Sequence, residues 1–167
     1  VVDAGSRIIA PSKTVFPLTE TARDGQEQWN LLDAPTHGYG EKVYYHDMAP
    51  QRDGSATVAI VNEHLGDGPF GVYVKYNKNE LPRFTQWKMM GEQDYVVGLE
   101  PCTCGVQGRA IDEQLGLMHS LKPGERRTFN LEFGAITTAE EIKAVEAKCR
   151  GIKTGFTSDY RTFVRKP

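Results

Sequence analysis

The alternation of apolar and polar residues in short runs is the feature that most limits the folds open to this chain. In the run FGVYVKYN, residues 70–77, every second side chain is apolar, and β-branched and aromatic residues predominate. Similar runs, bounded by turn residues, lie at 41–48, 56–62, 84–89, 94–100, 115–121 and 126–134. Seven such runs at spacings of roughly 8 to 15 residues predict an all-β protein, an antiparallel β-sandwich or barrel.

The two ends of the chain show different patterns. The first 35 residues predict irregular structure with short edge strands, because Pro11 and Pro17 each remove a backbone donor. Near the other end, Thr138 and Glu141 form a capping box ahead of an apolar stripe, which predicts one C-terminal helix over 137–150. Residues 160–164, YRTFV, are compatible with a further edge strand.

Composition narrows the range of partners. The 167 residues fit a single domain, 1–167, and 20 basic against 22 acidic residues leave no basic surface for nucleic acid. No apolar run approaches the roughly 18 residues needed to cross a membrane.

The odd cysteine count favours a reducing compartment, so a cytoplasmic location is expected. Cys102 and Cys104 lack the second ligand pair typical of zinc sites, so we expect buried thiols there, without a metal or other cofactor.

Glu100 is the main candidate for chemistry. It ends the run DYVVGLE, in which Tyr95, Val97 and Leu99 face one way while Gly98 and Glu100 face the other. Because burial of an unpaired carboxylate is costly, an acid at the end of so apolar a strand predicts a partner or a task, with open space beside Gly98. The pattern alone is equally compatible with an exposed glutamate at the end of a strand.

The preceding run places Gln86 and Lys88 on one face and Trp87 on the other. An amide, a cation and an indole beside a carboxylate would suit a sugar, which forms hydrogen bonds at its rim and CH contacts with aromatic faces. The alternative is that Trp87 belongs to the core and Lys88 is a solvated cover.

Glu41 and His46 form a third group of candidates, on the run that begins at Glu41. They are separated by an odd number of positions, so a regular strand would point them to opposite faces. Both would line one pocket only if a bulge intervened.

Three segments, GYGEKVYYHD, LPRFTQWKMMGEQDYVVGLEPCTCGVQGR and LKPGERRTFNLEFG, resemble the galactose mutarotase-like superfamily, in its poorly characterised aldose 1-epimerase-like branch. The resemblance implies a β-supersandwich and a small-molecule sugar ligand. In mutarotases of this superfamily, a glutamate in an LE motif is the general base and a histidine protonates the ring oxygen. GLEP places Glu100 in the position of that glutamate, as the catalytic residue, and Glu41 matches an acid that holds sugar hydroxyls.

The resemblance also implies further substrate-binding residues: Gln86, Trp87 and Lys88 on the neighbouring strand, His46, and Arg109 on the loop that leaves Glu100. The family's histidine motifs, of the kind Asn-His-x-x-Phe-Asn, do not occur in this sequence. We therefore expect the C-terminal portion of a longer epimerase-like enzyme, whose remainder supplies the acid. The alternatives are a non-catalytic carbohydrate-binding or sensing domain and a purely structural interaction domain, and a homo-oligomer would cover exposed sheet edges.

Overall fold

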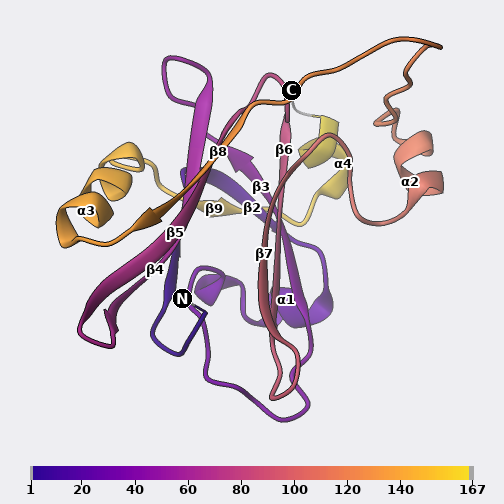
Figure 1. The fold of residues 1–167 in the computed structure, drawn as a ribbon. Coiled ribbons are helices and arrows are strands. Elements are labelled where there is room, and N and C mark those ends of the chain that lie inside the picture. Colours follow the sequence, from indigo (N-terminus) through magenta and orange to yellow (C-terminus); the bar gives the residue numbers. More distant parts are fainter. Residues whose placement is uncertain (1, 166–167) are drawn as a thin grey trace.

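The computed structural model describes residues 2–165, which form two facing β-sheets (Figure 1). The first sheet has the strand order β1 (Arg7–Ile9), β4 (Ser55–Leu65), β5 (Gly68–Asn77), β8 (Leu131–Ile136). The second has the order β7 (Tyr95–Cys102), β6 (Arg83–Met90), β3 (Lys42–Met48), β2 (Ser12–Pro17), β9 (Gly155–Phe156). Neighbouring strands are antiparallel, except that β9 runs parallel to β2. The predicted all-β sandwich is confirmed.

The main core lies between the two sheets. Every strand except β8 contributes residues to it, and Tyr76 of the first sheet stacks on Phe84 of the second with ring centroids 6.0 Å apart. Tyr95, Val97 and Leu99 of β7 pack against the same core, on the side predicted from their spacing. The opposite face of β7, which carries Gly98 and Glu100, therefore points away from the first sheet.

Strand β4 is buried along its first eight residues because both of its faces are covered. One face points into the main core, and helix α3 (Ala139–Lys148) covers the other with Ile142 and Val145. The predicted capping box of Thr138 and Glu141 is present at the start of α3. The C-terminal helix is thus confirmed in position and in its starting signal, and Figure 1 shows it outside the first sheet.

The outer face of the second sheet is partly covered by α2 (Arg109–Gln114), α4 (Tyr160–Arg165) and the chain between α2 and β8. Phe163 of α4 and Leu117 pack there against Phe16 and Tyr45. The strand predicted at 115–121 is wrong, because Leu117 anchors a loop to this small core while Leu121 is exposed. The edge strand suggested at 160–164 is also wrong, since these residues form α4.

Two boundaries differ from those predicted. The run at 126–134 becomes a strand only from Leu131, and Phe133 in it has 73% of its surface exposed. The first 35 residues contain β1 at a sheet edge, as expected, but β2 pairs with strands on both sides. A short helix, α1 (Glu20–Asp24), and a 3₁₀ turn, η1 (Gln26–Gln28), follow β2. No helix within residues 2–165 is long and apolar enough to cross a membrane.

Candidate functional site

Glu100 lies on the outer face of the second sheet, where β7 pairs with β6. It stands opposite Thr85, and Gly98 stands opposite Trp87 in the same ladder. Its carboxylate folds back over Gly98, so a Cβ atom added there would collide with Oε1 of Glu100. The predicted space beside the acid is therefore present, and the carboxylate occupies it.

Among residues 2–165, the carboxylate of Glu100 forms no hydrogen bond or ion pair with another group. The side chain is nevertheless partly buried, and this burial raises the pKa of Glu100 above its usual value. An unpaired carboxylate with a raised pKa can accept a proton more readily than an ordinary surface glutamate.

Trp87 and Glu41 form a second polar group on the same face. The indole Nε1 donates a hydrogen bond to Oε2 of Glu41 at 2.9 Å, although Trp87 is on β6 and Glu41 directly precedes β3. Trp87 is half-buried and lies across the ladder from Gly98, so it is not the core residue of the alternative interpretation. Glu41 is exposed, and its bond to Trp87 leaves the second carboxylate oxygen facing solvent.

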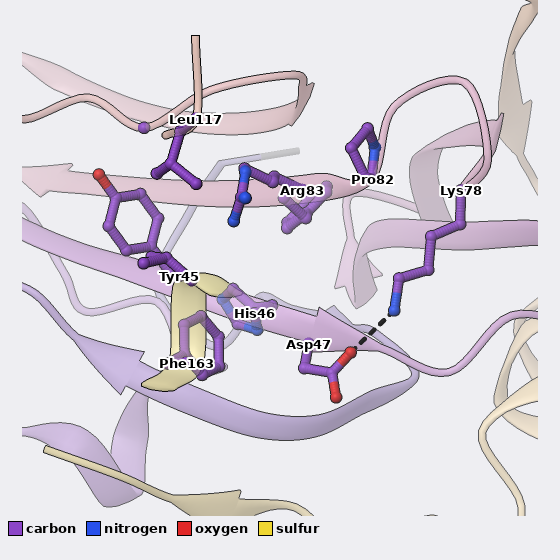
Figure 2. A pocket seen from close by; sticks show the side chains of 11 residues that line it. Tyr45, His46, Asp47, Lys78, Pro82, Arg83, Leu117 and Phe163 are labelled. Atoms are coloured by element: carbon purple, nitrogen blue, oxygen red, sulfur yellow. Dashed lines mark hydrogen bonds and ion pairs between the residues drawn. The ribbon is translucent and has the colours of Figure 1, made fainter. Parts of the chain in front are cut away.

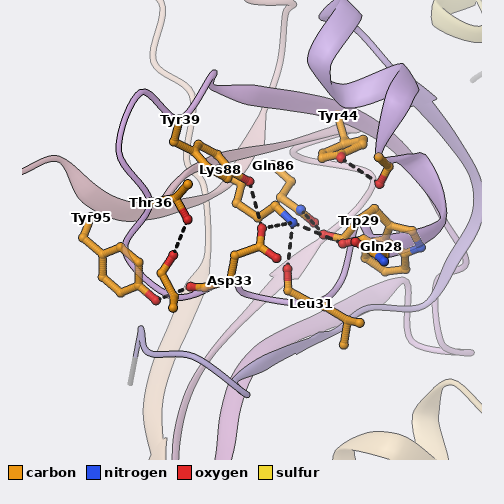
Figure 3. Close-up of polar contacts among 12 residues, drawn as sticks. Gln28, Trp29, Leu31, Asp33, Thr36, Tyr39, Tyr44, Gln86, Lys88 and Tyr95 are labelled. Carbon is orange, nitrogen blue, oxygen red and sulfur yellow. Dashed lines mark hydrogen bonds and ion pairs between the residues drawn. The ribbon is translucent and has the colours of Figure 1, made fainter. Parts of the chain in front are cut away.

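Gln86 and Lys88 lie on the inner face, opposite to Glu100, so the predicted wall shared with Glu100 is wrong. Nζ of Lys88 donates to the carbonyls of Gln28 at 3.1 Å and Leu31 at 2.7 Å, and Gln86 donates to a neighbouring carbonyl of the same loop (Figure 3). Lys88 is only 1% exposed, and burial lowers its pKa to about 8. Both side chains hold the loop at 28–33 against the sheet.

His46 is also on the inner face and is 3% exposed. Its Nδ1 is hydrogen-bonded to Oγ of Ser12 at 2.8 Å, and its ring meets the rings of Trp29 and Phe84 edge-on. Burial lowers the pKa of His46 to about 3. The prediction that Glu41 and His46 point to opposite faces of the sheet is confirmed. His46 therefore does not lie on the face of Glu100.

This burial predicts a pH dependence of stability. The unfolded chain binds a proton at His46 below pH 6.5, whereas the folded chain does so only near pH 3, so the free energy of unfolding should fall as the pH drops between these values. Urea titrations at several pH values should show a shallower fall for His46→Gln than for the wild type. The exposed His37 provides the control, and an unchanged slope in His46→Gln would contradict the assignment.

Arg109 is the first residue of α2 rather than part of a loop, and its side chain is exposed. The segment before α2 is fixed to the outer face of the second sheet, because the hydroxyl of Tyr45 accepts the N–H of Val106 at 2.7 Å. The buried carboxylate of Asp112 accepts the N–H of Gly105 at 3.1 Å. These bonds place α2 on the side of the sheet that carries Glu100.

Sequence reasoning missed a pocket at one end of this outer face (Figure 2). Its lining includes Tyr45, Arg83, Leu117 and Phe163. Arg83 pairs with Cys102 in the ladder, two positions from the pair of Thr85 with Glu100, so it shares the face of Glu100. If the predicted strand at 84–89 had begun one residue earlier, the alternation of residues 83, 85 and 87 would have placed Arg83 on the same face as Trp87.

Among the other reactive side chains, Cys102 shares the sheet face of Glu100, two residues further along β7. All three cysteines are free thiols, and Sγ of Cys102 lies 3.6 Å from Oγ1 of Thr85. In the described part of the chain, no three His, Cys, Asp or Glu side chains form a cluster suited to a metal ion. His37 pairs with Glu92 at 3.0 Å, away from the β7 end that carries Glu100.

Comparisons with known proteins agree with this architecture. The structure is similar to the crystal structure of a protein described as a candidate aldose 1-epimerase from Klebsiella pneumoniae subsp. pneumoniae MGH 78578, with a TM-score of 0.84 and 26% identity. The match covers 93% of this chain and 41% of the Klebsiella protein, so this chain spans less than half of that protein's length. No curated protein matches the sequence.

The fold is therefore aldose 1-epimerase-like, as the resemblance predicted. A family model described as a domain of unknown function, DUF4432, matches residues 1–135, which include β1 to β7, Glu100 and Arg83. The chain belongs to the DUF4432 family.

Proposed function

We propose that the protein binds a free sugar or sugar derivative and interconverts its two anomers, with Glu100 as general base. The observation that carries this proposal is the state of Glu100: a partly buried carboxylate with no partner in the described chain, beside an indole on an open sheet face. The aldose 1-epimerase-like fold adds support, because the similar Klebsiella protein is described as a candidate for this activity.

The chemistry requires one base and one acid. Glu100 removes the proton of the anomeric hydroxyl, the C1 oxygen forms a carbonyl, and the bond between C1 and the ring oxygen breaks. The electron pair goes to the ring oxygen, which takes a proton from an acid. Rotation of the aldehyde and the reverse steps close the ring on its other face, so protons and electrons balance over the cycle.

Trp87, Glu41 and Arg109 are the proposed binding residues. The indole of Trp87 offers an apolar face to sugar CH groups, and its hydrogen bond to Glu41 orients a carboxylate toward ligand hydroxyls. Arg109, at the start of α2, supplies hydrogen-bond donors to the ligand from the side of α2. Gln86, Lys88 and His46 support the sheet from inside and take no part in the proposed site.

We propose that the acid comes from chain outside this stretch. His46 is buried on the inner face with a pKa lowered to about 3, which makes it a poor proton donor near neutral pH. This chain corresponds to 41% of the similar Klebsiella protein, so a longer protein has ample chain to supply a histidine. Residues 1–167 are, on this proposal, the part of the enzyme that carries the base.

We also propose a cytoplasmic setting and a small-molecule partner rather than nucleic acid. The free thiols of Cys102, Cys104 and Cys149 favour a reducing compartment.

An apolar groove between Leu99 of β7 and Phe133 of β8 lies open, and association with more chain of the same protein, or with a second copy, would cover it.

The proposal is tested by exchange between α and β anomers. NMR saturation transfer on D-glucose and D-galactose should show exchange faster than in buffer when the longest natural form of the protein is present. Calorimetry on the same samples measures binding. Binding without faster exchange would replace the enzyme with the carbohydrate-binding alternative, and the absence of both would contradict the sugar proposal.

Gly98→Ala provides a separate prediction. The new methyl group would displace the carboxylate of Glu100 without straining the backbone, because Gly98 lies in an ordinary strand conformation. We expect anomer exchange to slow by about tenfold to a hundredfold, since misplacement of a catalytic group by about 1 Å has effects of that size. The melting temperature should change little. An unchanged exchange rate would show that the position of this carboxylate is irrelevant.

A further inference from the structure

The guanidinium of Arg83 lacks a partner in the described part of the chain. Its Nε is buried and donates no hydrogen bond, and no carboxylate of residues 2–165 forms an ion pair with it. Other arginines in partly covered positions are paired, as Arg7 is with Glu63 and Glu146 at 2.7 Å each. A buried N–H donor without an acceptor is costly, so Nε of the partly buried Arg83 calls for a ligand that supplies one.

The pocket around Arg83 is narrow, and its lining brings two cations, Arg83 and Lys78, against one carboxylate, Asp47. Figure 2 shows the guanidinium between Tyr45 and Pro82, below Leu117. Asp47 also lines the pocket, but it is engaged by Lys78 at 2.8 Å and by Lys13 at 3.2 Å. Asp47 therefore does not neutralise Arg83, and the narrow space suits a small oxyanion better than a whole sugar ring.

The register places Arg83 on the same sheet face as the proposed base, although Glu100 does not itself line this pocket. Arg83 pairs with Cys102, and Thr85 pairs with Glu100, so Arg83 and Glu100 are diagonal neighbours on one face. Such diagonal pairs have Cα atoms about 7 to 8 Å apart, within reach of long side chains. A ligand whose anomeric centre contacts Glu100 would reach Arg83 only with a substituent that extends toward Cys102, because the carboxylate of Glu100 bends the other way, over Gly98.

From these observations we propose that the pocket binds an oxyanion of the ligand through Arg83, so that the substrate is a sugar carrying a carboxylate or a phosphate group. This inference rests on the proposed sugar function for the identity of the ligand, but the anion site itself stands on the structure of the pocket. Arg83 is a specificity-determining residue in this scheme, because it selects the substituent without touching the reacting atoms.

The anion site is tested first without a sugar. Inorganic phosphate and acetate are titrated into the wild type, Arg83→Gln and Arg83→Lys, with binding followed by NMR shifts of the amides around Tyr45 and Leu117. Arg83→Gln should weaken the tighter-binding anion by about tenfold to a hundredfold, and Arg83→Lys less, because lysine keeps the charge but loses the planar fork. The exposed Arg52 gives the matched control, Arg52→Gln.

The sugar arm compares D-glucose, D-glucose 6-phosphate and D-glucuronate in the anomer-exchange assay. The phosphate and carboxylate arms identify which anion is recognised, and Arg83→Gln should raise KM for that sugar about tenfold or more while leaving D-glucose unchanged. Equal anion affinity in the wild type, Arg83→Gln and Arg52→Gln would overturn the inference. If exchange is absent but anion binding still depends on Arg83, the proposed catalysis fails and the anion site remains.

Discussion

Replacing Glu100 with glutamine is expected to slow anomer exchange by a factor of about 10² to 10⁴, the usual contribution of a general base. The amide has nearly the same shape as the carboxylate and fits over Gly98 in the same way. It cannot accept the proton of the anomeric hydroxyl, so the loss should appear in kcat while sugar binding is retained. NMR saturation transfer measures the exchange rate, and calorimetry measures the affinity.

The pH dependence gives a second reading of the same variant. Burial raises the pKa of Glu100, so the activity of the wild type should rise with pH as this group loses its proton, at a pH above the ordinary glutamate value of 4.5. This acid limb should be absent from the residual activity of Glu100→Gln. Glu92→Gln, at an exposed turn, controls for the loss of one negative charge. Equal rates for wild type and Glu100→Gln would remove Glu100 from the mechanism.

Replacing Lys88 with alanine is expected to lower the free energy of unfolding by about 2 to 5 kcal/mol, because carbonyl groups lose their charged donor and packed methylene groups are removed. The variant loses the donor to two loop carbonyls, Gln28 at 3.1 Å and Leu31 at 2.7 Å, and the nearby charge that faces Asp33 at 3.9 Å. It also leaves a cavity on the inner face of the sheet. Urea denaturation measures the change.

The control is Lys122→Ala, which removes an exposed lysine in the turn after residue 121 and should change stability by less than about 0.5 kcal/mol. Lys88→Met adds a pH test. Burial lowers the pKa of Lys88 to about 8 from 10.5, so between these pH values the unfolded chain holds more protons than the folded one. Stability of the wild type relative to Lys88→Met should therefore rise over this interval. Equal effects of Lys88→Ala and Lys122→Ala would contradict the buried network.

The strands that alternate most regularly could be predicted from the sequence, and the reason is physical. Residues 70–77 and 94–100 each have one apolar face, and part of that face packs against the main core, which fixes both the strand and the direction of its side chains. The segment 115–121 misled because its leucines resemble an alternating strand. Only Leu117 is buried there, and a single anchor on a loop leaves the same local pattern as a strand.

The candidate site was predictable in part for the same reason. Parity placed Gly98 and Glu100 on one face, put Trp87 on the face opposite to Gln86 and Lys88, and separated Glu41 from His46. Polarity misled for Lys88 and Gln86, because their partners are carbonyls of the loop at 28–33, which no local pattern reveals. A lysine is expected at the surface when only its local sequence is considered, and it is buried here because a segment distant in sequence folds over it.

The pocket of Arg83 was beyond sequence reasoning because its walls come from segments that are distant in the sequence. Tyr45 is on β3, Arg83 begins β6, Leu117 lies on a loop and Phe163 is on α4. Neither composition nor periodicity brings these positions together. The element that closes the pocket, α4, was itself predicted as a strand, so its covering role could not be expected.

The central claim, that Glu100 is the base of a sugar site, is tested most directly by a crystal structure of the protein with a bound aldose. The account predicts that the anomeric hydroxyl lies within about 2.6 to 3.2 Å of an oxygen of Glu100, with the sugar ring against Trp87. A sugar bound elsewhere, with the carboxylate of Glu100 still facing solvent, would contradict it.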